Sequence, residues 1–242
     1  MRLATTTGDF AHYCSSQEEC MEYIAKAGFK NIDYNFCLDY NWKNGIFSAD
    51  WKQHLENVKR KAEELGLTFV QAHAPMGSPL VPGNEAFTEA TKRCIEGCAV
   101  LGIPNIVVHS GYLPDITKEE AFEKNKVFFM ELLKFAEQFQ INVLVENFNK
   151  MCIDGLYWID NAVDLRAMID YVDHPLFHAC WDAGHGNMQD MPQDEALRIL
   201  GEHVYALHIQ DNLGRDDSHI APFCGSLNLD AVMQGLMDIG YK

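Results

Sequence analysis

The stretch Asn-Val-Leu-Val-Glu-Asn at residues 142–147 decides the fold, because a short apolar run ends directly on the carboxylate of Glu146. Similar runs recur, as in Ile-Val-Val-His at 106–109 and Ala-Cys-Trp-Asp at 179–182. A longer amphipathic stretch follows each run. Short apolar strands that alternate with helices are typical of a parallel sheet built from βα units.

This alternation predicts seven strands and seven helices. The predicted strands are Leu3–Thr6, Asn31–Asn35, Thr68–His73, Asn105–His109, Asn142–Glu146, Phe177–Asp182 and Val204–Gln210. The predicted helices are Gln17–Ala27, Trp51–Leu65, Ala86–Leu101, Lys118–Phe139, Ala162–Tyr171, Gln193–Leu200 and Leu229–Ile239. Glycines directly after several helices, such as Gly66 and Gly102, supply the left-handed residue that often ends a helix.

We therefore expect a single TIM-barrel domain of the (β/α)8 type over residues 1–242, with the eighth strand lacking at the C-terminus. An eighth strand would begin after Gly240, where only Tyr241 and Lys242 follow. A sheet of seven strands would leave two unpaired edges, which proteins normally avoid. We expect either a longer product or another chain, in a homo-oligomer for example, to cover this gap.

The composition of the chain limits the classes of partner that it is expected to bind. The chain has 19 basic and 35 acidic side chains, and its net charge of −16 disfavours binding to a nucleic acid. Neither a signal sequence nor an apolar run of membrane-spanning length is evident, and the eight cysteines are scattered. We expect a cytoplasmic protein with reduced thiols and no membrane partner.

Polar residues that bind metals stand at the ends of five successive predicted strands. They are His73, His109, Glu146, Asp182 and His208. In a parallel barrel these ends meet on one face. Carboxylate oxygen together with imidazole nitrogen suits Mn²⁺ or Zn²⁺ first, with Mg²⁺, Co²⁺ or Fe²⁺ as alternatives. A single histidine at a strand end is more often a packing residue, but the pattern jointly predicts a metal held by Glu146, Asp182 and His208.

Further candidates lie in the predicted loops after the sixth and seventh strands. His185 follows Asp182 by three residues, and Asp217 and His219 follow the seventh strand. They are candidates for an additional metal or for binding substrate hydroxyls, and a solvated polar loop is the alternative. Aromatic residues that could pack a sugar ring or equally belong to the core are Phe10, Tyr34, Phe148, Trp158 and Trp181.

Taken together, these motifs resemble the xylose-isomerase-like barrel superfamily, which holds sugar isomerases and epimerases and also endonuclease IV. The motifs are Ala-His-Ala-Pro at 72–75, Val-His-Ser-Gly at 108–111, Val-Glu-Asn at 145–147, Asp-Ala-Gly-His at 182–185 and His-Ile-Gln-Asp-Asn at 208–212. The resemblance runs through nearly the whole chain and is specific to the superfamily without choosing a member.

The epimerase branch implies one metal held by Glu146, Asp182, His208 and a strand-eight glutamate that has no counterpart here. In that branch the two glutamates act as acid and base on opposite faces of the substrate carbon. Our leading hypothesis is a sugar isomerase or epimerase that acts on a small sugar or keto-sugar through a metal-stabilised enediolate. Glu146 would be a ligand and base, and His185 would polarise or reprotonate a substrate oxygen.

Three alternatives stay open. The endonuclease branch implies three zinc ions and phosphodiesterase activity on abasic DNA. Its ligands have counterparts at His73, His109, Glu146, Asp182, His185, His208, Asp217 and His219, and the net charge weighs against this reading. A lyase or dehydratase would use the same enediolate chemistry. A sugar-binding subunit without catalysis is the non-enzymatic reading.

Overall fold

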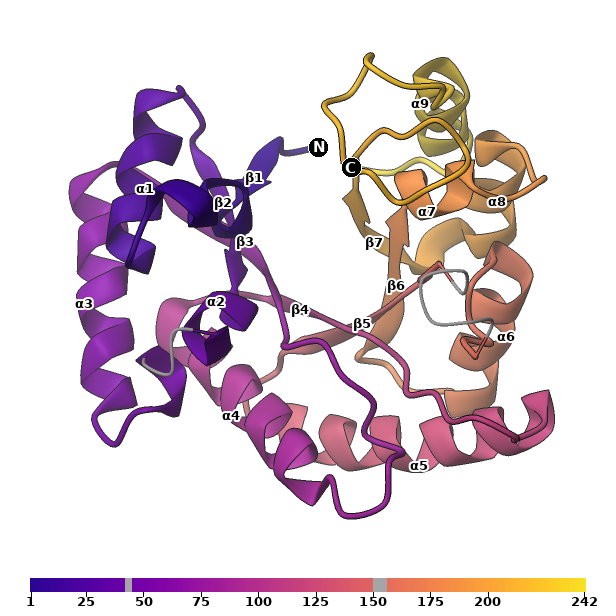
Figure 1. The fold of residues 1–242 in the computed structure, drawn as a ribbon, viewed down its shortest axis with the longest axis horizontal. Helices are drawn as coiled ribbons and strands as arrows, with labels where there is room; N and C mark the ends of the chain where they lie inside the picture. The colour runs from indigo at the N-terminus through magenta and orange to yellow at the C-terminus, as the bar shows by residue number, and fades with distance from the viewer. Residues whose placement is uncertain (42–44, 150–155) are drawn as a thin grey trace. The chain divides into compact units, whose positions relative to one another are not determined.

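A computed structural model describes residues 1–41, 45–149 and 156–242 of the chain (Figure 1). Within these residues, one sheet of seven strands runs in chain order from β1 to β7. The strands are β1 (Ala4–Thr6), β2 (Asn31–Asn35), β3 (Thr68–His73), β4 (Asn105–Val108), β5 (Asn142–Glu146), β6 (Phe177–Asp182) and β7 (Val204–His208). The β1–β2, β2–β3, β3–β4 and β6–β7 ladders are parallel. An eighth strand is not seen among the described residues.

The chain divides into two compact units. The first comprises Met1–Gly77, Glu85–Val108 and Leu132–Val143, and the second comprises Ser78–Asn84, His109–Glu131 and Leu144–Lys242. β5 belongs to both units, because the division falls between Val143 and Leu144.

The first unit contains β1 to β4 and the helices that follow them. These helices are η1 (Thr7–Tyr13), α1 (Gln17–Lys26), α2 (Phe36–Asn41), η2 (Gly45–Phe47), α3 (Trp51–Glu64) and α4 (Glu85–Leu101). Helices α1 and α3 lie side by side (Figure 1). Apolar side chains such as Ile32, Ile46 and Leu55 are fully buried. Among polar side chains, Gln71 on β3 donates to Asp33 on β2 at 2.7 Å.

The second unit contains the end of β5, the strands β6 and β7, and helices that carry or flank the candidate site. These helices are α6 (Ala162–Val172), α7 (Ala183–Asn187), α8 (Gln193–Leu200), η4 (Gly201–His203) and α9 (Leu229–Asp238), while α5 (Lys118–Ala136) contributes to both units. Asn161 caps α6 by accepting from the Asp164 amide, as its residue type favours. Helices α8 and α9 lie side by side (Figure 1).

The predicted strands agree closely with the observed ones. β4 ends at Val108, so His109 is the first residue after the strand rather than its last, and β7 ends at His208 rather than Gln210. β1 begins at Ala4 instead of Leu3. The bounds of α8 agree with the prediction, and α5 ends at Ala136 rather than Phe139. Each of the other long predicted helices differs from the observed one by a single residue at one end. Helix ends fray, which explains differences of this size.

The short helices were not predicted. They are η1, α2, η2, α7 and η4, none longer than seven residues. A helix of one or two turns shows too little of the 3.6-residue period to be recognised. The expectation that His185 lies in a loop is therefore wrong, because α7 begins directly after Asp182. No helix in the described part of the chain is both long and apolar enough to cross a bilayer.

Candidate metal centre

β5, β6 and β7 carry Glu146, Asp182 and His208 at their carboxyl ends. Asp182 pairs with His208 across the β6–β7 ladder, and His208 Nδ1 lies 2.9 Å from Glu146 Oε1. The two carboxyl side chains are each only 2% exposed. The structure therefore brings the three predicted ligands together, and we call them the strand-end group.

His109 and Phe148 flank Glu146 in the same unit. His109 Nε2 lies 3.5 Å from Glu146 Oε2. The Phe148 ring packs edge-on against two imidazoles, with centroids 4.9 Å from His109 and 5.0 Å from His185. Of the aromatic candidates, Phe148 thus lies beside the strand-end group, whereas Trp181 is buried and donates its indole N–H to Gln193.

Asn147 ties the ends of β5 and β6 together. Its amide Nδ2 donates to the Asp182 carbonyl at 3.0 Å, and its Oδ1 accepts from the Asp182 amide at 2.7 Å. Its own carbonyl lies 2.8 Å from His185 Nδ1. The fully buried Asn147 side chain therefore holds the backbone of Asp182, while the Asn147 backbone carbonyl holds the His185 ring.

His185 lies at the start of α7, where Asp182 acts as the helix N-cap and accepts from the His185 amide at 2.7 Å. A second group forms around its ring. His185 Nε2 lies 3.2 Å from Asp217 Oδ2, and His219 Nε2 lies 3.2 Å from Asp217 Oδ1. We call His185, Asp217 and His219 the loop group, because two of its members follow β7 in a loop.

Gln210 links the two groups. Its Nε2 donates to Asp217 Oδ1 at 2.9 Å and approaches Asp182 Oδ1 at 3.4 Å. The Gln210 side-chain amide packs against Gly184. A Cβ built on Gly184 would lie 2.0 Å from Gln210 Cδ. Gly184 therefore has a steric reason to lack a side chain, which the sequence alone does not reveal.

The charges in the two groups are strongly coupled. Burial, reinforced by the Glu146 charge, raises the pKa of Asp182 even though His185 opposes the rise. Burial alone would lower the pKa of His185, but Asp182, Asp217 and Glu146 outweigh it and raise that pKa to about 9. For Asp217, hydrogen bonds from the two histidines overcome burial and lower its pKa. In the metal-free protein His185 is therefore an imidazolium at neutral pH, donating from both ring nitrogens.

His73 ends β3 in the first unit, where its Nδ1 lies 2.7 Å from the Ala74 carbonyl oxygen. That His73 joins residues of the second unit in binding a metal or substrate stays a prediction. The other candidates, His109, Glu146, Asp182, His185, His208, Asp217 and His219, all belong to the second unit.

Three residues that hold the groups in place were not among the predicted site residues. They are Asn147, Gln210 and Asp211, and the fully buried carboxylate of Asp211 organises the loop after β7. The available signal was their place in the motifs at 145–147 and 208–212, within three residues of a predicted ligand.

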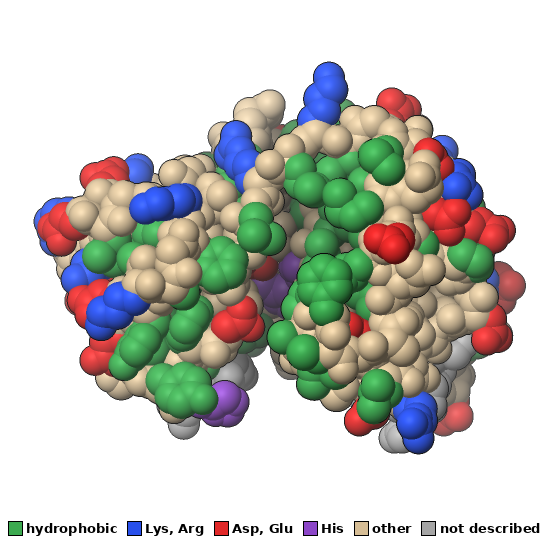
Figure 2. Space-filling view, turned by 90° about the horizontal axis from the view of Figure 1, so that it is seen from above, with side chains coloured by type: hydrophobic (Ala, Val, Ile, Leu, Met, Phe, Trp, Pro, Cys, Tyr) green, Lys and Arg blue, Asp and Glu red, His purple; other side chains and the backbone are tan. Residues whose placement is uncertain are grey.

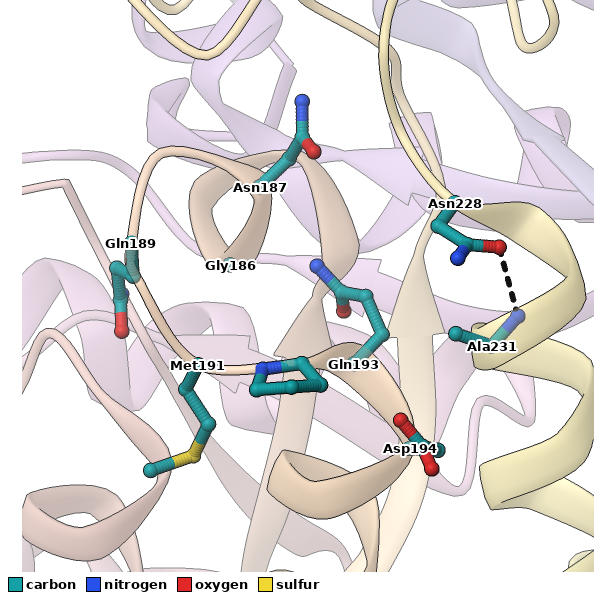
Figure 3. Close-up of a pocket in the computed structure, with 9 residues that line it drawn as sticks. Gly186, Asn187, Gln189, Met191, Gln193, Asp194, Asn228 and Ala231 are labelled. Carbon is teal, nitrogen blue, oxygen red and sulfur yellow. Dashed lines mark hydrogen bonds between the residues drawn. The ribbon is translucent and has the colours of Figure 1, made fainter.

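A separate pocket of about 170 Å³ lies beside α7, between the first turns of α8 and α9 (Figure 3). Its polar lining comes from side-chain amides such as Asn187 and Gln189 and from the carboxylate of Asp194. Asn228 faces it while accepting from the Ala231 amide (Figure 3). None of the sequence-predicted site residues is among the described residues that line it.

A family model described as a xylose isomerase-like TIM barrel matches residues 7–242. The chain belongs to this family. Membership confirms the predicted resemblance and the TIM-barrel fold class. Within the family, the uncharacterized protein MJ1311 of Methanocaldococcus jannaschii is 30% identical over 183 residues, which are 71% of this chain. The match spans 61% of that relative, less than two thirds of its length.

Several solved structures share the fold. The IOLI protein with a bound zinc atom superposes with a TM-score of 0.81 at 18% identity, covering 100% of this chain and 86% of that one. A D-tagatose 3-epimerase-like protein gives 0.79 at 20% identity, with 100% and 88% covered. A family 2 AP endonuclease from Brucella melitensis gives 0.79 at 17% identity, with 100% and 90% covered.

Proposed function

We propose that this chain is a divalent-metal-dependent isomerase or epimerase of small sugars or keto-sugars. The observation that carries the proposal is the strand-end group, in which Glu146, Asp182 and His208 lie together at the ends of three consecutive strands. Sugar epimerases among the structural neighbours support the same chemistry.

The donor set of the strand-end group fits a divalent cation. Glu146 and Asp182 are almost fully buried, and His208 Nδ1 lies 2.9 Å from Glu146 Oε1. His185 of the loop group also approaches this site, because ligand atoms of Glu146, Asp182 and His185 all lie within 4.8 Å of one another. Burial raises the pKa of Asp182, and repulsion from the Glu146 carboxylate adds to the rise. A divalent cation would offset that repulsion, and mixed oxygen and nitrogen donors suit manganese and zinc.

A metal bound there supplies Lewis acidity that stabilises negative charge on a substrate oxygen when a proton leaves the neighbouring carbon. Glu146 would accept that proton, and its backbone is held by Tyr157, whose hydroxyl lies 3.4 Å from the Glu146 carbonyl. His185, whose Nδ1 lies 3.7 Å from Glu146 Oε1, would polarise or reprotonate a substrate oxygen. Phe148 packs edge-on against the imidazoles of His109 and His185.

The proposal is tested by hydrogen exchange. We expect the manganese-loaded protein in deuterated water to incorporate deuterium at the carbon next to the carbonyl of at least one ketose in a panel. Glu146→Gln should lower the exchange rate by about 10² to 10⁴, the usual contribution of a general base. Glu64→Gln, the same change on an exposed face of α3, should leave the rate unchanged. Exchange of no substrate by the metal-loaded protein would refute the proposal.

The second candidate function is a three-zinc phosphodiesterase that acts on abasic DNA. The loop group favours it, because Asp217 and His219 add two further candidate ligands, whose ligand atoms lie within 4.8 Å of one another and of His185. The net charge of −16 weighs against it, and Lys and Arg side chains on the face in Figure 2 are dispersed among acidic ones. Close to three zinc ions per chain, together with nicking of abasic DNA, would favour this function over the first.

A further inference from the structure

The loop of residues 212–227, between β7 and α9, carries Asp217 and His219. A loop this long with little regular structure is uncommon in a compact domain unless it has a function. The loop nevertheless has a defined path, because the backbone N–H and C=O of Asp211 both pair with Ile220 at 2.9 Å in an antiparallel bridge. The loop therefore folds back on the strand from which it starts.

The Asp211 carboxylate ties the beginning and the end of this loop to one point. Oδ1 accepts from the Asn212 amide at 2.8 Å and from the Leu227 amide at 3.0 Å. Oδ2 accepts from the Gly225 amide at 2.9 Å. The side chain is fully buried, so these bonds are not exchanged with water. Charge-assisted bonds from backbone amides to a buried carboxylate are among the stronger ones in proteins.

The packing around this carboxylate is tight. A Cβ at Gly225 would come within 2.3 Å of Asp211 Oδ1 and of the Asn212 carbonyl oxygen. Only glycine can therefore bring its amide this close without moving the carboxylate. Gly225 and Asp211 form a matched pair at the closing point of the loop.

Asn212 connects the folded loop to α7, the helix that carries His185. Its Nδ2 donates to the Gly184 carbonyl at 2.8 Å, and its Oδ1 accepts from Asn187 at 2.9 Å. The same Oδ1 accepts from the Gly214 amide at 2.8 Å, at the turn that leads to Asp217. The loop and the helix are thus linked at Gly184 and Asn187, one before and one after His185 in the chain.

We propose that Asp211 is the positioning residue of the loop group, because its buried carboxylate folds residues 212–227 so that Asp217 and His219 meet His185. Asp211 itself does not touch the ligand atoms. Its role is to make the loop group a preformed site, which a ligand does not have to order on binding.

The first test follows the loop without any metal. Arg215 is exposed within the loop and offers a trypsin cleavage site. In the EDTA-treated protein we expect Asp211→Asn to speed cleavage after Arg215 at least tenfold, because the new amide group cannot accept from the loop backbone at both positions. Asp230→Asn, the same change at an exposed position in the first turn of α9, should leave the rate unchanged.

Gly225→Ala provides a second variant, in case Asp211→Asn fails to fold. It disturbs the same carboxylate from the opposite side, so cleavage after Arg215 should also accelerate at least tenfold. Cleavage within twofold of the wild-type rate in a folded variant of either kind would overturn the proposal.

The second test rests on the proposed function, since it uses metal binding. In a zinc titration we expect Asp211→Asn to weaken zinc binding at the loop group at least tenfold. Zinc affinity at the strand-end group should not change. His185→Asn shows the result expected when the loop group is lost. Wild-type zinc affinity at both groups in Asp211→Asn would overturn the role of Asp211. If the wild-type protein binds neither zinc nor manganese, the proposed function fails, and the trypsin rates alone decide the role of Asp211.

Discussion

The strand-end group and the loop group lie next to each other in the second unit but are built in different ways. Glu146, Asp182 and His208 each occupy the last position of a strand, so the ladder hydrogen bonds of the sheet fix them. The loop group takes one residue from the five-residue helix α7 and two from a loop. Its geometry depends on buried side chains such as Asp211 and Asn212.

The most exposed member of the two groups is His219, which is 59% exposed and has a left-handed backbone conformation with φ +46°. Glu146, Asp182 and His185 are each at most 3% exposed. A group fixed by the sheet tolerates changes in its surroundings, and a group fixed by a loop depends on a few specific contacts. Each prediction below breaks one group and measures whether the other is affected.

The largest expected effect follows Asp182→Asn. This variant removes a buried carboxylate from the strand-end group and should weaken metal binding there by more than the 10- to 100-fold typical of a change beyond the direct ligands. Isothermal titration with manganese measures it. The amide still caps α7, so His185 and the loop group should keep their zinc affinity. Equal losses at both groups would show that they are one site.

A smaller expected effect is the pH dependence of the folding stability of the metal-free protein. Because folding raises the pKa of His185 from 6.5 to about 9, its protonated form stabilises the fold fully below pH 6.5. This contribution is lost as the pH rises through about 9, and it amounts to at most about 3 kcal/mol. The carboxylates that face the ring are those of Glu146, Asp182 and Asp217.

Urea unfolding in EDTA at pH 6 and pH 9.5 measures this contribution. We expect the wild-type protein to lose stability between these pH values and His185→Asn to lose markedly less. With excess zinc, stability should instead rise with pH below pH 9. A metal binds only the neutral imidazole, so zinc binding strengthens as His185 loses its proton. An identical pH dependence in both proteins would remove His185 as its source.

The smallest expected effect follows His219→Asn. The exposed pair of His219 with Asp217 should contribute less than about 1 kcal/mol to the stability of the metal-free protein. Zinc affinity at the loop group should fall about tenfold, while manganese binding at the strand-end group stays the same. A loss of manganese binding in this variant would contradict the separation of the two groups.

The accuracy of each predicted element depends on the length of the sequence pattern that indicates it. Strands such as 142–146 and 177–182 were predicted to the residue, because each apolar run ends on a carboxylate that marks the end of the strand in the sequence. Helix α7 was missed because its five residues include two glycines. Those glycines are explained only by the Gln210 amide and the Trp181 ring packed against them.

By itself the sequence determined the alternation of strands and helices, the family resemblance, and the position of Glu146 and Asp182 at strand ends. It could do so because strand periodicity and the convergence of parallel strand ends are local or topological rules. Only the tertiary structure decided that Asp217 and His219 meet His185, and that Asn147, Gln210 and Asp211 hold both groups. Those contacts join residues up to 38 positions apart, through side chains whose partners no local pattern specifies.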